Sequence, residues 1–368
     1  MGLPFRYKCW VAIPRQSWVR TMPANRRRAT ITDVAKEAGV AIKTVSRVLN
    51  NEANVSQETL EKVRKAIKAL DYSPSVAARV LAGNKSFLIG MFYNTPSSYY
   101  MNAIQIGALE RCREAGFHLI LELCNSEARD AATTILATIS HTRMDGVILT
   151  PPVSDNQAIC DALVRQNIPH VLVSPPKIPH DVSCVHMDNR RAAFDITSYL
   201  IALGHKRIGF ITGHFRHGAA KLRLLGYQDA LKAHGISPND SLIKEGDFRF
   251  QSGVEMAEEL LRRKTRPTAI FAANDEMAAG VVTAAHRLGF AVPGDLSIAG
   301  FDDVPYASVT WPALTTVRQP IGEMGAGAAA LLLDQIESKK NDAPEMRSSI
   351  SFKYEIKIRE STGPAPLR

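Results

Sequence analysis

The hydrophobic pattern near the start of the chain predicts two short helices joined by a turn within residues 31–51. Each helix has an apolar stripe at helical spacing, formed before the turn residue Gly39 by Val34, Ala35 and Ala38, and after it by Val45, Val48 and Leu49. When the second stripe faces inward, polar and cationic side chains face outward, namely Lys43, Ser46, Arg47 and Asn50. A short helix with such an outer face is typical of proteins that bind the major groove of DNA.

A third helix is predicted after Ser56, which is a good N-cap residue. Its apolar face is formed at helical spacing by Leu60, Val63, Ile67 and Leu70. Pro74 ends this helix, and residues 75–86 follow with only one or two helical turns. So short a helix is marginal in water when isolated, so we expect it to fold only against a partner.

From residue 87 onward, short apolar runs alternate with helical stretches. The predicted strands are residues 87–93, 117–123, 146–150, 170–174, 207–213, 268–274 and 296–302. Apolar strands separated by helices predict parallel sheets that are buried on both faces. Seven such units are too many for one small sheet, so we expect two α/β subdomains with a ligand cleft at the carboxyl ends of their strands.

The charge of the chain is concentrated at the predicted helix-turn-helix. The chain has 368 residues, enough for two or three domains, and a net charge of +9. Residues 1–84 hold 15 Lys and Arg against 6 Asp and Glu, whereas the remainder holds 30 of each. A basic small domain joined to a neutral large one indicates a polyanionic partner at one end only.

Other classes of protein are disfavoured by what the sequence contains. No run approaches 18 apolar residues, so no membrane span and no membrane partner are expected. The five cysteines are scattered without metal-ligand spacing, which favours a reduced, cytoplasmic compartment and no metal. We find no GxSxG, Walker or HExxH motif, so neither an enzyme nor a cofactor is expected. His214 and His217 are interpreted as part of a polar loop rather than a metal site.

Residues 1–28 do not resemble a secretory signal, because they lack its apolar core. Met22 is followed by PANRRR, a short basic segment that leads directly into the first helix. Our hypothesis is therefore that residues 1–28 form a poorly structured extension and that translation starts at Met22.

Motifs along almost the whole chain carry a family resemblance. They are TITDVAKEAGVAIKTVSRVLN, VSQETLEKVRKAIKALDYSP, AARVLAG, MDGVIL, MDNRRAA, LIALGHKRIGFITG, RLLGYQDAL, AIFAANDEMAAG, VPGDLSIAGFDD and PALTTVRQP. In this order and spacing, over residues 29–358, the chain resembles the lactose-repressor (LacI/GalR) family of bacterial transcription regulators. The resemblance implies a multidomain fold: an all-α helix-turn-helix head, a hinge helix, and a two-subdomain α/β core like that of periplasmic binding proteins.

The resemblance also implies which residues contact DNA. The implied set is Thr32, Ile42, Lys43, Thr44, Ser46, Arg47, Asn50, Ala78 and Leu81. Ile42 would pack on a thymine methyl group, and Lys43 would donate to guanine. Arg47 would contact a base or a phosphate, while Thr44, Ser46 and Asn50 would contact phosphates and so fix the register of the helix on DNA. In the hinge helix, Leu81 would wedge into the minor groove, with Ala78 small enough for close approach. The family often has Ser where this chain has Ala41, so the N-cap of the reading helix is missing here.

In the core, the resemblance implies an effector pocket formed by Tyr99, Ser174, Arg223, Phe248, Asn274, Asp302 and Gln319. Arg223 would bind sugar hydroxyls or a carboxylate, and a structural ion pair is the alternative for Arg223 and Asp302. Phe248 and Tyr99 would stack on an apolar ring face, unless they serve ordinary packing. Some sugar-responsive members carry Asp at the position of Ser174. Asp275 is favoured as a helix cap over a ligand contact.

We therefore expect a dimeric transcription regulator, most simply a repressor, that binds a palindromic operator and responds to a small molecule. A sugar is the first candidate for the effector and a nucleobase the second. The alternatives are a solute-binding protein of the sugar-transport type and an enzyme on the same core. The expected organisation is an extension (1–28), a head (29–74), a hinge (75–85) and a core (86–368), the core divided into an N-subdomain (86–187 and 319–346) and a C-subdomain (188–318 and 347–360).

Overall fold

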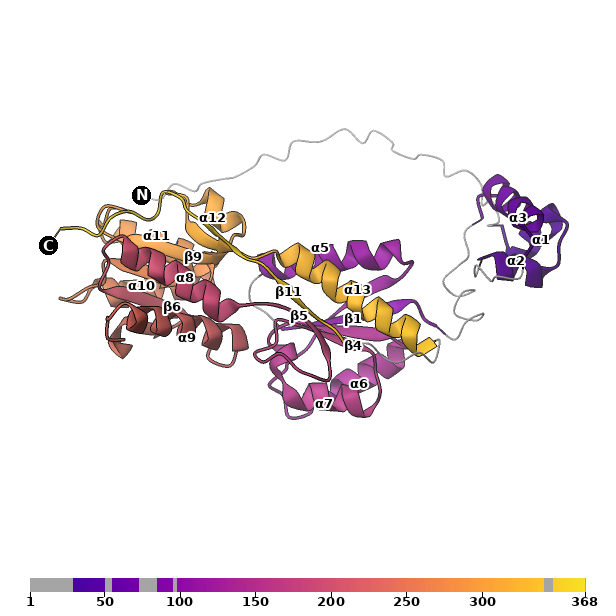
Figure 1. The fold of residues 1–368 in the computed structure, drawn as a ribbon, viewed down its shortest axis with the longest axis horizontal. Coiled ribbons are helices and arrows are strands. Elements are labelled where there is room, and N and C mark those ends of the chain that lie inside the picture. The colour runs from indigo at the N-terminus through magenta and orange to yellow at the C-terminus, as the bar shows by residue number, and fades with distance from the viewer. Residues whose placement is uncertain (1–28, 50–54, 73–84, 95–97, 341–346, 368) are drawn as a thin grey trace, which may run out of the picture. The chain divides into compact units, whose positions relative to one another are not determined.

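The structure is a computed structural model that describes residues 29–49, 55–72, 85–94, 98–340 and 347–367. The chain divides into two compact units between Ala82 and Gly83, a small helical head and a large core (Figure 1). Several predictions fall outside the described residues: the extension with Met22, Cys9, Asn50, and the hinge segment with Ala78 and Leu81.

In its described residues, 29–49 and 55–72, the head consists of α1 (Ile31–Ala38), α2 (Ile42–Leu49) and α3 (Gln57–Ala69). Its buried core contains the predicted Val34, Ala35, Val45, Val48 and Val63, together with Ala66 and Tyr72, which were not predicted. The other predicted positions are partly buried and pack against this core: Ala38, Leu49, Leu60, Ile67 and Leu70. Gly39 ends α1 with φ +65°, a left-handed conformation that glycine adopts without steric cost. The three predicted helices and their inward faces are thus confirmed.

The first subdomain of the core is a six-stranded parallel sheet in the order β11-β5-β4-β3-β1-β2. Its strands are β1 (Leu88–Tyr93), β2 (His118–Leu123), β3 (Gly146–Leu149), β4 (His170–Val173), β5 (Ser183–Met187) and β11 (Ser349–Phe352). Helices α5 (Ser98–Glu114) and α13 (Ile321–Lys340) cover one face, and α6 (Ala131–Thr142) and α7 (Gln157–Arg165) cover the other (Figure 1). Helices α5 and α13 cross in backbone contact, since a Cβ added at Gly107 would lie 1.9 Å from the carbonyl oxygen of Gly322.

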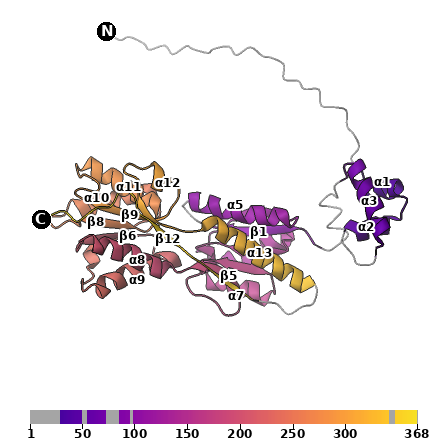
Figure 2. The ribbon, with the colours of Figure 1, turned by 45° about the horizontal axis from the view of Figure 1, so that its top comes forward.

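The second subdomain is a six-stranded sheet in the order β12-β10-β9-β8-β6-β7, in which only β12 is antiparallel to its neighbour. Its strands are β6 (Ile208–Thr212), β7 (Ile243–Glu245), β8 (Ala269–Ala272), β9 (Ser297–Asp302), β10 (Thr315–Arg318) and β12 (Glu355–Lys357). Its helices are α8 (Asn189–Ala202), α9 (Gly218–Ala233), α10 (Phe250–Leu261), α11 (Asp275–Arg287) and the short α12 (Pro305–Val309). Figure 2 shows helices on both faces of this sheet as well.

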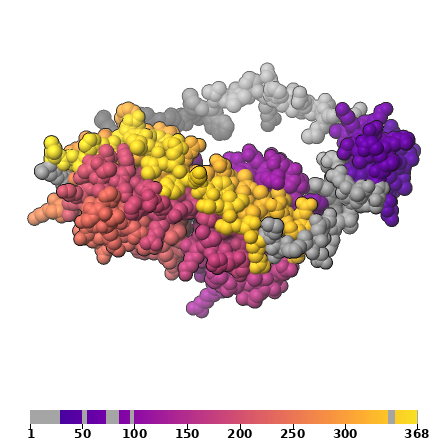
Figure 3. Space-filling view, in the orientation of Figure 1, coloured from indigo at the N-terminus to yellow at the C-terminus, as the bar shows by residue number. Residues whose placement is uncertain are grey.

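Among the described residues, the chain passes between the two sheets at residues 187–189, 318–321 and 352–355. In Figure 3 the last part of the chain, coloured orange to yellow, lies over both subdomains. In the described part of the chain, the two subdomains are therefore joined through several connections rather than through a single linker.

All seven predicted strands are present. The prediction missed β5, β7, β10, β11 and β12, which are short, rich in polar residues, or at a sheet edge. One assignment needs correction: residues 347–360 were assigned to the C-subdomain, but β11 pairs with β5 of the first sheet. The change of subdomain therefore comes after Phe352. In the described residues, no helix combines the length and apolar character needed to span a membrane.

Candidate functional site

The first candidate site is the outward face of α2 in the head. Val45 and Val48 are buried against α1 and α3, so the helix turns its other side to solvent. Thr32, Ile42 and Lys43 are exposed, and Thr44, Ser46 and Arg47 are half-buried. An apolar side chain such as Ile42, 48% exposed beside a lysine at a helix start, suits contact with base edges in a groove.

The start of α2 differs from the starts of its neighbours. Thr30 forms a capping box with Asp33 at α1, and the Ser56 hydroxyl caps α3 by accepting from the backbone N of Thr59. At α2, Ala41 supplies only its carbonyl oxygen, to the backbone N of Thr44 (2.8 Å) and Val45 (3.2 Å). Helix α2 therefore begins without a side-chain cap.

The second candidate site is a cavity between the two subdomains of the core. It is lined by Tyr100, Pro151, Ser174, Asn189, His217, Ala219, Arg223, Phe248, Asn274, Asp302 and Gln319. Six of the seven residues predicted for the pocket line this cavity together. The exception is Tyr99, which is 41% exposed and packs edge-on against Tyr306, while its neighbour Tyr100 takes the place in the lining.

Arg223 forms the polar centre of the cavity, although only 6% of its side chain is exposed. Its Nε donates to Asn189 Oδ1 (3.0 Å), its Nη1 donates to the carbonyl oxygen of Ala273, and Nη1 lies 3.5 Å from Asp302 Oδ1. The guanidinium group also lies 3.6 Å from the centre of the Phe301 ring. These contacts fix the plane of the guanidinium group. Arg223 therefore lines the cavity and also forms the ion pair with Asp302 that was the alternative prediction.

Asp302 connects Arg223 to the crossover between the subdomains, because Gln319 Nε2 donates to Asp302 Oδ1 at 2.6 Å. Burial raises the pKa of Asp302 to about 6, even though Arg223 and Gln319 both favour the charged carboxylate. Asp302 also has φ +109°, a conformation that L side chains rarely adopt. Strained residues of this kind are concentrated at functional sites.

Asn274 lines the cavity, and both its amide oxygen and its amide nitrogen make structural hydrogen bonds. Its Oδ1 accepts from the backbone N of Met277 (2.9 Å), which caps α11, and its Nδ2 donates to the carbonyl oxygen of Phe248 (2.8 Å). The helix-capping role expected for Asp275 is thus performed by Asn274. Asp275 instead accepts from the backbone N of Val304 and the hydroxyl of Thr316, and burial raises its pKa well above the ordinary range.

Aromatic groups cover the apolar part of the cavity. Phe248, at φ +68°, packs its ring against Gly213, where any Cβ would collide with it, and lies 5.3 Å from the ring of His217. Burial lowers the pKa of His217 to about 4, so this imidazole is neutral at pH 7. Burial likewise raises the pKa of Tyr100 to about 12, so the cavity has a second neutral polar ring.

Two polar contacts cross the cleft beside the cavity, one made by the first residue of α9 and one by the loop before it. The backbone N of Gly218 donates to Asp155 Oδ2 at 2.7 Å, and Arg216 Nη1 forms a 2.6 Å ion pair with Glu127 Oε2. Gly218 also lies against Pro176, which a Cβ at this position would meet at 2.5 Å. The loop therefore holds the two subdomains together at the mouth of the cavity.

Tyr100, Pro151, Asn189, His217 and Ala219 were not predicted as lining residues. A signal was available for some of them, since Pro151 directly follows a predicted strand and His217 lies in the loop after another. Parallel sheets place such positions at the ligand edge. Among the described residues, no group of three His, Cys, Asp or Glu could hold a metal ion. Cys112, Cys124, Cys160 and Cys184 are buried without a disulfide.

Comparison with known proteins gives consistent matches over both units. Residues 30–75 match the family model of bacterial regulatory proteins of the lacI family, and residues 197–362 match a periplasmic binding protein-like domain. The HTH-type transcriptional repressor PurR of Pectobacterium carotovorum is 36% identical over 317 residues, which is 86% of this chain and 92% of that protein.

Two further proteins show the same likeness. The ribose operon repressor of Escherichia coli is 36% identical over 84% of this chain and 93% of its own length. Among solved structures, the lac repressor dimer bound to operator and the anti-inducer ONPF has a TM-score of 0.76 at 28% identity, over 92% of this chain and all of that one.

Proposed function

Because the chain belongs to the lacI family of bacterial regulatory proteins, we propose that it represses transcription under the control of a small molecule bound in the cavity of its core. PurR and the ribose operon repressor, which match over most of this chain, are transcriptional repressors, so the expectation that this chain is not an enzyme is confirmed. The solute-binding alternative is excluded because residues 30–75, which precede the core, match the lacI family of bacterial regulatory proteins. The observation that carries the proposal is the pocket between the subdomains, in which Arg223 pairs with Asp302 and Asp302 accepts from Gln319 of the crossover.

We propose that residues 29–74 form the DNA-binding head and that 86–368 form the effector-binding core, with residues 75–85 as the hinge between them. In the head, Ile42 and Lys43 would read base edges, and Arg47 would make a further base or phosphate contact. Thr32, Thr44, Ser46 and Asn50 would contact phosphates and so position the head on the DNA, while Ala78 and Leu81 would enter the minor groove.

The chain is proposed to bind its palindromic operator as a homodimer, each copy contributing one head. The first subdomain offers a surface that supports this pairing. Strand β2 is a sheet edge on which Leu121 and Leu123 are 44% and 74% exposed, and Ile106 of α5 is 48% exposed. Such an edge is normally covered in a soluble protein.

A neutral sugar is the effector that the cavity favours. Arg223 and Asp302 largely balance each other's charge, and His217 is neutral. Asn189 and Gln319 add amide groups, so the described lining residues include no cation without a counter-charge that would favour an anionic ligand. Fixed donors and acceptors beside the aromatic ring of Phe248 suit a ring with several hydroxyl groups. A nucleobase is the second candidate, because Phe248 and His217 also present flat ring faces. The protein would act in the cytoplasm, where its operator is found.

Two measurements test the proposal. Binding of the full chain to DNA fragments selected from a random pool should weaken steeply with salt, as expected when Lys and Arg displace counterions. Thermal-shift screening against sugars and nucleobases should then identify a compound that both stabilises the core and changes DNA affinity. Binding of DNA without any dependence on salt, or stabilisation by a sugar that leaves DNA affinity unchanged, would contradict the proposal.

A further inference from the structure

Two consecutive aspartates at the end of β9 contact different partners in the core. Asp302 has φ +109° and Asp303 has φ +58°, so both adopt backbone conformations that L side chains rarely take. Asp302 contacts the cavity residues Arg223 and Gln319. Asp303 contacts Arg359 and Arg318 instead. The strained backbone thus separates two neighbouring carboxylates onto different partners.

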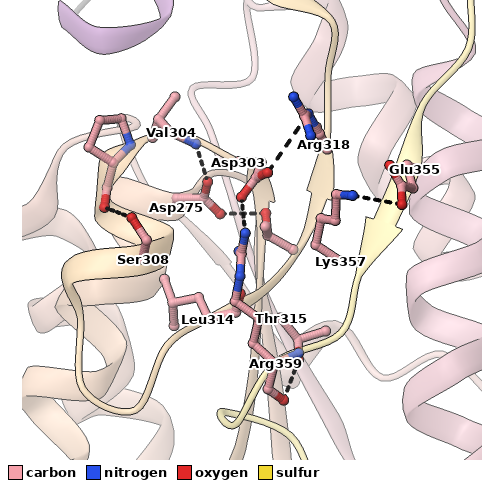
Figure 4. Close-up of polar contacts among 12 residues, drawn as sticks. Asp275, Asp303, Val304, Ser308, Leu314, Thr315, Arg318, Glu355, Lys357 and Arg359 are labelled. Atoms are coloured by element: carbon pink, nitrogen blue, oxygen red, sulfur yellow. Dashed lines mark hydrogen bonds and ion pairs between the residues drawn. The ribbon is translucent and has the colours of Figure 1, made fainter.

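The Asp303 carboxylate is held mainly by Arg359. Arg359 Nη2 lies 2.6 Å from Asp303 Oδ1, and the two side chains are only 24% and 12% exposed (Figure 4). Arg359 is itself fixed, because its Nη1 donates to the carbonyl oxygen of Leu314 (2.9 Å) and its backbone N donates to Thr315 Oγ1 (2.9 Å). This ion pair therefore anchors the end of β9 to β10 and to the segment that follows β12.

A second, weaker contact links Asp303 to the crossover between the subdomains. Arg318 Nε lies 4.0 Å from Asp303 Oδ2, and Arg318 directly precedes Gln319, the residue that donates to Asp302. The backbone N of Gln319 also donates to the carbonyl oxygen of Asp302 (3.3 Å). Asp302 and Asp303 at the end of β9 are thus paired with Gln319 and Arg318 at the end of β10.

We propose that Asp303 is a positioning residue of the effector site, which holds the Asp302 carboxylate against Arg223 and ties it to the crossover at Gln319. Asp303 does not line the cavity and would not contact the effector. Its ion pair with Arg359 keeps the two left-handed residues from relaxing, so its loss would move Asp302 and loosen the crossover. This inference rests on the proposed function, since it assigns Asp303 a role in the same effector site.

The test uses the full chain with the substitution Asp303→Asn, which removes the charge at nearly constant size. Arg359→Gln should reproduce its effects, and Arg318→Gln should give a smaller one because its contact is longer. Asp229→Asn is the matched control, since it breaks a 2.6 Å ion pair with Arg190 on the surface of the same subdomain. In ligand-free protein, hydrogen exchange should rise at residues 300–304 and 317–321 in Asp303→Asn but not in the control.

The effector measurement uses as probe whichever of D-ribose, D-glucose, cellobiose and hypoxanthine most raises the melting temperature of the wild-type chain. Its affinity should fall about tenfold in Asp303→Asn and stay unchanged in Asp229→Asn. A merely structural role would lower the melting temperature of Asp303→Asn without changing the probe affinity or the exchange at 317–321, and that result would overturn the inference.

The failure of the proposed function can be told apart from the failure of this inference. If none of the four probes binds the wild-type chain, the proposed effector classes fail, and the exchange pattern alone decides the role of Asp303. If Asp303→Asn does not fold, Arg359→Gln decides it by the same two measurements. Unchanged exchange at 317–321 in that variant would then overturn the inference.

Discussion

The Asp155 carboxylate on the first subdomain accepts a hydrogen bond of 2.7 Å from the backbone N of Gly218, the first residue of α9 on the second subdomain. A helix N-terminus carries unpaired N–H groups and a partial positive charge, so a carboxylate is a suitable partner. Because the contact spans the cleft, it links the two subdomains beside the cavity. The other Asp155 oxygen, Oδ1, is buried without a hydrogen-bond partner, so this contact also has a cost.

We predict that Asp155→Asn changes the pH dependence of core stability. Burial raises the pKa of Asp155 to about 6, so the folded core holds this proton more tightly than the unfolded chain does. The stability that this bound proton adds to the folded core is therefore fully present below the unfolded pKa and is lost as pH rises through about 6. Asparagine keeps an acceptor for Gly218 but does not titrate. The melting temperature, measured from about pH 4.5 to pH 7.5, should fall less steeply in Asp155→Asn than in wild type.

Asp302 titrates in the same range, because burial raises its pKa to about 6 as well. Asp302→Asn should therefore also flatten the profile, and the double variant should flatten it further. Equal slopes in wild type and Asp155→Asn would refute the assignment of this proton to Asp155.

Replacing Arg223 by Ala should abolish the effector response and also destabilise the core. The substitution leaves the Asp302 carboxylate buried without its cation, and breaking a buried ion pair typically costs about 3–5 kcal/mol. DNA binding should persist, since the head folds around its own core. Calorimetric unfolding, together with DNA binding measured with and without effector, checks both effects.

Arg223→Lys separates the two roles of this side chain. Lysine keeps a positive charge near Asp302 but lacks the planar fork that bonds Asn189 and Ala273. Stability should largely recover while the effector response stays lost. A variant that responds normally to the effector would show that Arg223 is outside the binding site.

Much of the cavity could be predicted because its residues follow strands. Ser174, Asn274 and Asp302 come at or directly after the apolar runs of β4, β8 and β9, and parallel strands bring their carboxyl ends to one edge. Helix positions lacked that signal. Tyr99 and Tyr100 are adjacent in α5, and only the rotation of the packed helix decides which of them faces the cavity.

The contacts that close the cavity could not be predicted from the sequence. Glu127 and Arg216 are 89 residues apart and meet only because the two subdomains face each other. The same applies to β11, whose alternating and partly exposed residues fit either sheet until the pairing with β5 is known. Long-range pairing, rather than local propensity, decides such positions.

In the head, Lys43→Ala should relax operator preference more than it weakens non-specific binding. Lys43 is exposed at the start of α2, where a side chain can reach base edges, and one good base contact typically discriminates by about 1–3 kcal/mol. Competition between selected and random DNA fragments measures this preference. Lys62, exposed on α3 in an ion pair with Glu58, supplies the control variant Lys62→Ala, whose operator preference should be unchanged.

The missing cap of α2 leads to a prediction in the stabilising direction. Ala41 has no side-chain acceptor for the first N–H groups of the helix, whereas Thr30 and Ser56 cap the other two helices of the head. Ala41→Ser should therefore stabilise α2 by about 1 kcal/mol, which slows amide exchange in residues 42–49 about fivefold. Thr30→Ala, which removes an existing cap, should speed exchange in α1 by a similar factor. If Ala41→Ser leaves exchange in α2 unchanged while Thr30→Ala has its full effect, the start of α2 is limited by its packing on α1 and α3 and not by the absent cap.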